Sequence, residues 1–188
     1  MALRRLIDAA TEPITTAEAK AHLRVVSSTD DTLIDGLVKV CRLIAENELR
    51  RSLITQTWVR TLDEFPDAIE LHYPPIIAVT SVKYYDTAGV QQTLAASQYS
   101  LDYQGEPGWI VPAYNVIWPD TLQAINAVEA TYTAGYGAAA DVPQAIKAWI
   151  LLQVGHLYEN REATVPGISI TPLPFVSSLL DPYRVVTF

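Results

Sequence analysis

The sequence has little of the chemistry that most enzymes and secreted proteins display. Its 188 residues include a single cysteine, which excludes an internal disulfide. Cys41 lies among Ile34, Leu37, Val38 and Ile44, so we expect it to be a small buried apolar side chain. No stretch reaches the ~18 uninterrupted apolar residues of a membrane span, and the N-terminal segment is a poor signal peptide. We therefore expect a protein that acts in the cytosol or in an assembly formed there.

Charge is also scarce, and it is predominantly negative. Charged residues make up 18% of the chain, below the roughly 25% that is typical of soluble domains. The net charge of −8 argues against a basic surface that grips nucleic acid. The low charge content favours apolar surface that is reserved for partners.

Histidines are too few and too scattered for a recognisable metal site. The chain has three of them, His22, His72 and His156, with no HExxH motif and no cysteine pair. His156 and Glu159 share one face of a predicted helix, and Glu162 continues that face. We interpret these three residues as the polar end of a packing helix, and we expect no metal and no cofactor.

Other patterns also fall short of a catalytic or ion-binding site. There is no GxSxG nucleophile motif. The glycine-rich segment 135–141 lacks the remaining residues of a phosphate loop, which favours a connection from a strand to a helix. Asp63, Glu64, Asp67 and Glu70 could bind Ca²⁺ but follow no regular loop motif, so a solvated strand edge is favoured. We therefore expect the protein not to be an enzyme.

The apolar periodicity predicts helices in two separate regions, about 16–51 and 142–162. Thr15 and Glu18 have the spacing of a capping box, which predicts a helix start. Asp141 is the expected N-cap of the last long helix, whose apolar residues cover most of its circumference. Such a helix must be buried among several neighbours, which predicts a small helical bundle.

One face of the second predicted helix is polar. Asp35, Lys39, Arg42 and Glu46 occupy the face opposite its apolar stripe.

Residues 55–134 between the two helical regions are predicted to form a mostly antiparallel β insertion. The segments 86–89 and 105–108 have the composition of turns between strands. Segment 128–134 alternates apolar and polar residues, as a half-buried strand does. We expect one α+β domain over residues 1–188, in which this insertion projects from the bundle.

The C-terminal segment 164–188 is apolar and interrupted by Pro166, Pro172, Pro174 and Pro182. Proline keeps such a segment extended, so we interpret it as an arm that docks into a groove or a neighbouring subunit. The alternative is that it packs along its own domain.

Six segments in order resemble a known family. They begin with "EAKAHLRV" and "SLITQTWVRTLDEFP", continue through "PPIIAVTSVKYYDTAGVQQTL" and "YSLDYQGEPGWIVPAY", and end with "VEATYTAGYG" and "VPQAIKAWILLQVGHLYENREA". Together they resemble the head–tail connector (adaptor) proteins of tailed phages, which also occur in prophages and gene transfer agents. The resemblance covers roughly residues 14–187.

The resemblance implies a structural protein of the virion neck, assembled in the cytoplasm of the bacterial host. Proteins of this family form a ring, typically of twelve subunits, between the portal protein and a tail-side stopper or tail terminator protein. The ring extends the DNA channel, and DNA passes through without specific binding. The family pattern carries no catalytic residue.

Two groups of residues would carry this role. The C-terminal arm would contact the portal or a neighbouring subunit through apolar anchors, which are Leu173, Phe175, Leu179, Leu180, Tyr183 and Phe188. Acidic residues of the second helix are candidates to face the channel, with plain solvent exposure as the alternative; they are Asp31, Asp35, Glu46 and Glu48.

Two other functions remain open at this point. One is a metal-dependent hydrolase that uses His156, Glu159 and the carboxylates of residues 63–70. The other is a soluble binding module that forms no ring.

Overall fold

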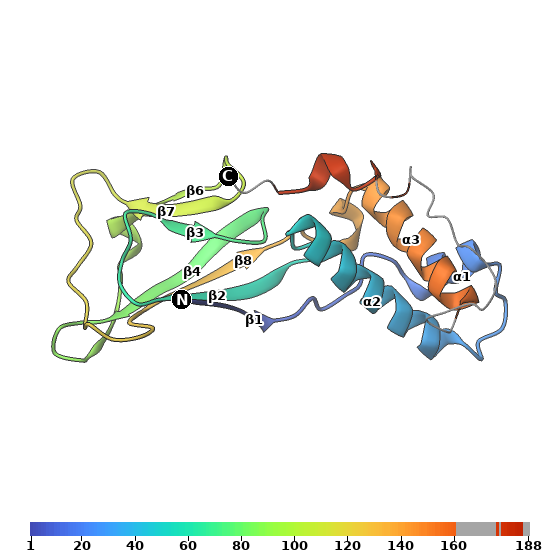
Figure 1. The fold of residues 1–188 in the computed structure, drawn as a ribbon, viewed down its shortest axis with the longest axis horizontal. Helices are drawn as coiled ribbons and strands as arrows, with labels where there is room; N and C mark the ends of the chain where they lie inside the picture. The colour runs from blue at the N-terminus through green and yellow to red at the C-terminus, as the bar shows by residue number, and fades with distance from the viewer. Residues whose placement is uncertain (161–175, 177, 186–188) are drawn as a thin grey trace, which may run out of the picture. The chain divides into compact units, whose positions relative to one another are not determined.

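The structure is a computed structural model, and it describes residues 1–160, 176 and 178–185. Contacts divide the chain into two compact units (Figure 1). The β unit contains the described residues 1–10, 55–136 and 185, and the helical unit contains 11–54, 137–160, 176 and 178–184. The predicted α+β class, with a β-rich insertion between helices, is confirmed.

The described strands of the β unit form two antiparallel sheets. A five-stranded sheet has the order β1-β2-β8-β4-β5, and a three-stranded sheet has the order β3-β7-β6. The strands are β1 (Ala2–Ile7), β2 (Gln56–Leu62), β3 (Ile69–Leu71), β4 (Ile76–Tyr85), β5 (Gln91–Thr93), β6 (Tyr99–Asp102), β7 (Gly108–Pro112) and β8 (Val128–Ala134).

Strand β8 is the centre of the larger sheet and confirms the predicted alternation. It pairs with β2 on one side and β4 on the other. Val128, Ala130 and Tyr132 are each 0% exposed, whereas the polar residues between them are half-buried. The Tyr132 hydroxyl donates to the carbonyl of His72 at 2.9 Å, and burial raises the pKa of its phenol.

The core of the β unit lies between the two sheets, which form separate layers in Figure 1. Ile69, Leu71 and Ile110 of the smaller sheet are fully buried and belong to one apolar cluster with Leu62 and Val82 of the larger sheet. Facing apolar surfaces of two sheets remove each other from water, which stabilises the pair.

Both predicted turns are present. The Asp86 side chain accepts hydrogen bonds from the N–H groups of Ala88 and Val90, at 3.0 and 2.9 Å, and Gly89 has a φ of 78°. This local network connects β4 to β5. Residues 103–107 connect β6 to β7 as an antiparallel hairpin, and Gly108, the last residue of the predicted turn, is the first residue of β7.

Strand β1 was not expected from the sequence. It pairs with β2 at the edge of the larger sheet, and only Leu3 and Arg5 among its six residues are partly buried. The Arg5 guanidinium lies 5.0 Å from the ring centroid of Trp58 and 2.8 Å from the Asp8 carboxylate. The sequence does not indicate this strand, because Arg5 occupies an inward position where an alternating pattern would have an apolar residue.

The helical unit contains α1 (Thr16–Leu23), α2 (Asp31–Leu49) and α3 (Gln144–Glu159), which pack against one another. Their contact buries a shared apolar core, which comprises Ile34, Val38, Cys41, Ala45, Leu49, Ile146, Trp149, Ile150 and Val154. The predicted bundle is confirmed. In the described chain, no helix combines the length and apolar character needed to cross a membrane.

The capping box before α1 is also confirmed. The Thr15 hydroxyl accepts from the Glu18 N–H at 3.2 Å, and the Glu18 carboxylate accepts from the Thr15 N–H at 2.7 Å. The backbone and hydroxyl hydrogen bonds from Thr15 lower the pKa of Glu18.

The predicted N-cap of α3 is wrong. The helix begins at Gln144 directly after Pro143, and Asp141 instead ends the short 3₁₀ turn η2 (Ala139–Asp141). Its carboxylate accepts from the Ala138 N–H at 2.9 Å. Gly137 has a φ of +122°, and a Cβ there would lie 2.7 Å from the same carboxylate. Asp141 therefore holds the connection that precedes the helix, which agrees with the predicted strand-to-helix connection.

Replacing Thr15 with alanine should lower the free energy of unfolding by about 1 kcal/mol at pH 7, because α1 loses its cap. The loss should become smaller as the pH falls below 4.5, the ordinary pKa of Glu18. The hydrogen bonds from Thr15 that lower this pKa stabilise the folded state only while the Glu18 carboxylate is charged. Urea denaturation at pH 7 and pH 3 measures both effects. Thr11→Ala, outside the capping box, is the control, and an equal loss in the two variants would contradict the assignment.

Candidate assembly surfaces

The residues that carry candidate chemistry do not converge. His22 and His156 are exposed on α1 and α3, whereas His72 directly follows β3, with its Nδ1 3.5 Å from Oε1 of Glu70. The side-chain amide of Asn160 donates to the His156 carbonyl at 3.0 Å. Within residues 1–160, 176 and 178–185, no group of three or more His, Cys, Asp or Glu side chains could hold a metal ion.

The carboxylates considered for Ca²⁺ or hydrolysis are likewise dispersed. Asp63 accepts from the Asn126 N–H at 2.9 Å, and Glu64 is exposed beside it. Glu159 is exposed on α3, and Glu162 lies outside the described residues. The hydrolase alternative therefore finds no ligand group in the described part of the chain.

Cys41 is buried in α2, as predicted. Its side chain is 0% exposed, and burial raises the pKa of its thiol to about 11. A thiol with this pKa is protonated at neutral pH and is a poor nucleophile, so its role is packing.

A buried ion-pair network corrects the predicted polar face of α2. Arg42 and Glu46 are both 0% exposed. Arg42 Nη1 donates to Glu46 Oε2 at 3.0 Å, and Arg42 Nε donates to Glu12 Oε2 at 2.7 Å. Glu46 Oε1 accepts from the Leu53 N–H at 3.1 Å. Burial is possible because both charges have partners, and helical periodicity does not reveal it because Glu12 and Leu53 lie outside the helix.

Two of the four predicted channel acids lie near the end of α2, and one is buried whereas the other is exposed. Glu46 is the wrong residue for a channel wall, because its carboxylate is buried within the network just described. Glu48 is exposed, with its carboxylate 3.6 Å from the guanidinium of Arg184.

The other two channel acids lie near the start of α2. Asp31 is half-buried and accepts from Lys20 Nζ at 2.6 Å. Asp35 is exposed and accepts from the Thr16 hydroxyl at 2.6 Å. These contacts connect α1 to α2, and a channel-facing role for either residue stays a prediction.

A second apolar row runs along α2, outside the core of the helical unit. It consists of Leu33, Leu37, Val40 and Ile44, whose spacing of three and four residues places them on one helix face. Leu33, Val40 and Ile44 are 39%, 46% and 40% exposed, and Leu37 is half-buried. We call these four residues the outer row of α2. A helix that buries one apolar face and exposes another is suited to a further packing partner.

Part of the predicted C-terminal arm is held on its own chain. Leu180 is 0% exposed, and Arg51 Nε donates to the Tyr183 carbonyl. Leu179 and Tyr183 are half-buried and stay predicted anchors. The remaining predicted anchors, Leu173, Phe175 and Phe188, lie outside the described residues.

The two units carry the net charge unequally. The β unit has four cations, Arg4, Arg5, Arg60 and Lys83, against ten acids, so it holds −6 of the chain's −8. Residues 84–146 contain no Lys, Arg or His. The negative charge thus belongs mainly to the β unit, whereas the predicted channel acids lie on α2 of the helical unit.

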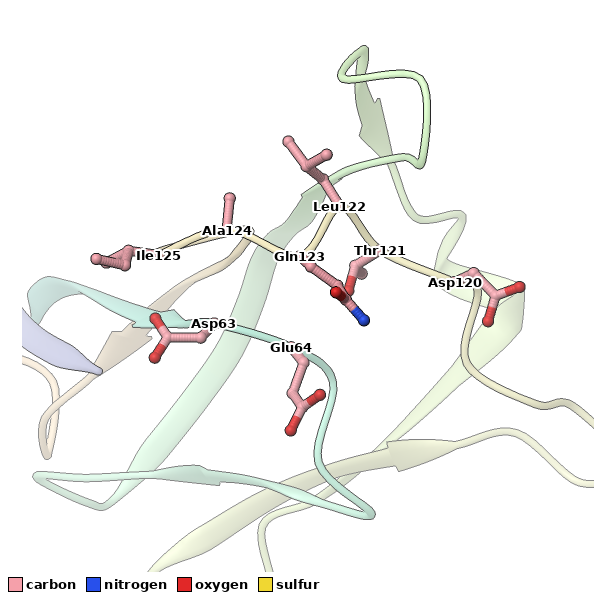
Figure 2. Close-up of a pocket in the computed structure, with 8 residues that line it drawn as sticks. All are labelled: Asp63, Glu64, Asp120, Thr121, Leu122, Gln123, Ala124 and Ile125. Carbon is pink, nitrogen blue, oxygen red and sulfur yellow. The ribbon is translucent and has the colours of Figure 1, made fainter.

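An open hollow of about 620 Å³ lies in this acidic unit. Asp63 and Glu64, which follow β2, line one side, and residues 120–125 of the connection between β7 and β8 line the other. Figure 2 shows the amide of Gln123 between Glu64 and Asp120. The hollow is negative and open to solvent, and periodicity could not identify it because its sides come from distant segments.

No protein-family model matches the chain, and no curated protein matches it significantly. Solved structures of gene transfer agent (GTA) particles contain similar chains. One, in the neck of an empty GTA particle computed with C6 symmetry, has a TM-score of 0.82 and 22% identity, covering 100% of this chain and 97% of that chain. The chain has the fold of a GTA neck chain.

Two further structures share this fold at the same identity and coverage. A chain in the virion of a native GTA particle has a TM-score of 0.81, and a chain in the neck of a native GTA particle computed with C12 symmetry has a TM-score of 0.76. The fold implied by the sequence resemblance is confirmed over the whole chain.

Replacing Arg42 with methionine removes the cation that pairs with the buried carboxylate of Glu46. We expect the free energy of unfolding to fall by about 3–5 kcal/mol, measured by urea denaturation at pH 7. Lys39→Met, at an exposed position of the same helix, should change it by less than about 0.5 kcal/mol.

The double variant R42M/E46Q distinguishes charge from packing. Its neutral amide still accepts the Leu53 N–H, so we expect it to be more stable than R42M alone. Equal stability of R42M and K39M would contradict the network.

Proposed function

We propose that this protein is a structural head–tail connector (adaptor) in the neck of a tailed phage or phage-like particle, and not an enzyme. The observation that carries the proposal is the fold shared with GTA neck chains over 100% of this chain. The virion neck, assembled in the cytoplasm of the bacterial host, is the proposed location.

The proposed connector forms a homo-oligomeric ring, with twelve subunits as the expected number. A closed ring needs two different patches on each subunit, because each patch meets the other type on its neighbour. The outer row of α2 supplies one such patch, and a second copy of this chain is its proposed occupant. The C12 symmetry of one GTA neck with a similar chain supports this arrangement.

The proposed ring extends the DNA channel below the portal. A net charge of −8 per subunit repels phosphates, so DNA would pass without specific binding. Asp31, Asp35 and Glu48 remain the α2 acids proposed to face the channel, since each lies at least partly at the surface.

The ring is proposed to contact the portal on one side and a tail-side stopper or tail terminator protein on the other. Leu179 and Tyr183, together with Leu173, Phe175 and Phe188, are the proposed contacts to the portal or a neighbouring copy. Leu180 is covered by its own chain and is less suited to this role.

Electron microscopy of purified particles tests the proposal directly. A peptide tag after Phe188, labelled with an antibody, should place the chain between the portal and the tail. Particles that contain the chain elsewhere, or that have a complete neck without it, would refute the connector role.

The ring contact has its own test. Val40→Asp puts a charge into the outer row of α2, and desolvating it at each subunit contact should reduce the number of copies per particle at least about tenfold. Quantitative mass spectrometry against a capsid protein measures this number. The matched control is Val26→Asp, which changes a 95% exposed valine outside the row and should leave the number unchanged. Equal numbers of copies per particle for the two variants would refute the proposed ring contact.

A further inference from the structure

The connection between β7 and β8, residues 113–127, exposes large apolar side chains. Tyr114, Ile117 and Ile125 are 93%, 90% and 81% exposed. We call this segment the 113–127 loop. Single exposed apolar residues are ordinary, but three on one loop leave substantial apolar area in water and are typical of an interaction site.

The loop is held in place by two contacts that lie between Ile117 and Ile125. The Trp118 ring stacks on Phe65, with centroids 4.8 Å apart and an interplanar angle of 10°. The Leu122 N–H donates to the Tyr85 carbonyl at 2.9 Å. A loop fixed in this way presents its exposed side chains with less ordering cost on binding than a loose one.

The charged side chains that line the hollow beside the loop are acidic, and the Met1 ammonium lies 3.8 Å from the Asp63 carboxylate. Asp63, Glu64 and Asp120 line the hollow beside it (Figure 2). In the described part of the chain, neither Glu64 nor Asp120 has an ion-pair partner. The loop lies within residues 84–146, which contain no basic residue. We therefore expect cations that match Glu64 and Asp120 to come from another molecule.

We propose that the 113–127 loop and the acidic hollow form a docking surface for a segment of another protein that carries lysine or arginine next to apolar side chains. The apolar partner residues would cover Tyr114, Ile117 and Ile125, and its cations would enter the hollow. DNA is disfavoured because its phosphates share the charge of the hollow. The inference deepens the proposed function, since it assigns one surface by which the connector holds a different neck protein.

Site-specific photo-crosslinking in purified particles tests this surface. A benzoylphenylalanine placed at Ile117 should crosslink to a different protein, and the crosslinked peptide should contain basic residues beside apolar ones. Glu64→Lys together with Asp120→Lys should lower the yield at least about fivefold by charge repulsion. Asp67→Lys together with Glu106→Lys makes the same charge change elsewhere in the β unit and should not.

Several outcomes would overturn the inference. They are a crosslink from Ile117 to a second copy of this chain or to DNA, no crosslink while the chain is present in particles, and an equal effect of the two double variants. Absence of the chain from particles would instead refute the proposed function, and a purified-chain measurement then decides the docking surface.

That measurement uses fluorescence anisotropy with the purified full chain and an octapeptide that alternates lysine and leucine. Glu64→Gln with Asp120→Asn should weaken its binding about tenfold, whereas Asp67→Asn with Glu106→Gln should not. The same peptide with glutamate for lysine, and a short DNA duplex, should not bind. Unchanged affinity in the first double variant, or binding of the duplex, would refute the surface.

Discussion

The buried pair of Arg42 and Glu46 is the constraint on which the helical unit depends. Both side chains are fully removed from water, and each has, besides the other, a hydrogen-bond partner outside α2. The carboxylate of Glu12, before α1, accepts a hydrogen bond from Arg42. The backbone N–H of Leu53, after α2, donates a hydrogen bond to Glu46. The bundle can therefore close only when the segments that enter and leave it are in position. Because the network lies on the inner side of α2, the helix keeps its outer apolar row free for another molecule.

In the β unit the corresponding constraint is the pairing of β8 with both β2 and β4. This strand has one fully buried face, so a shift of register by one residue would expose that face. The resulting rigid sheet supports an irregular connection that would otherwise be costly to hold in one conformation. The stack of Trp118 on Phe65 fastens the 113–127 loop to this support. Exposed apolar side chains on a loop fixed in this way suit a surface that recognises a partner.

The charge distribution suits the two units to different kinds of proposed contact. The helical unit is nearly balanced, and several of its charges join helices, as the contacts of Lys20 with Asp31 and of Arg184 with Glu48 do. The β unit is strongly acidic and has few cations of its own. In the proposed neck assembly, the outer row of α2 would join like subunits through apolar contact. The acidic hollow would select an unlike partner through charge, which adds specificity to apolar burial.

Much of this architecture could be predicted from sequence alone. The capping box at Thr15, the turn at Asp86 and the alternation along β8 were predictable because each depends on residues close together in the chain. The burial of Arg42 and Glu46, the strand status of residues 2–7 and the acidic hollow were not, because each depends on partners from distant segments. Local periodicity thus determined the fold class, the helices and most of the strands of this protein, with β1 as the exception. Tertiary packing alone decided which charges are buried and which apolar side chains stay exposed, because both depend on what the folded chain places around them.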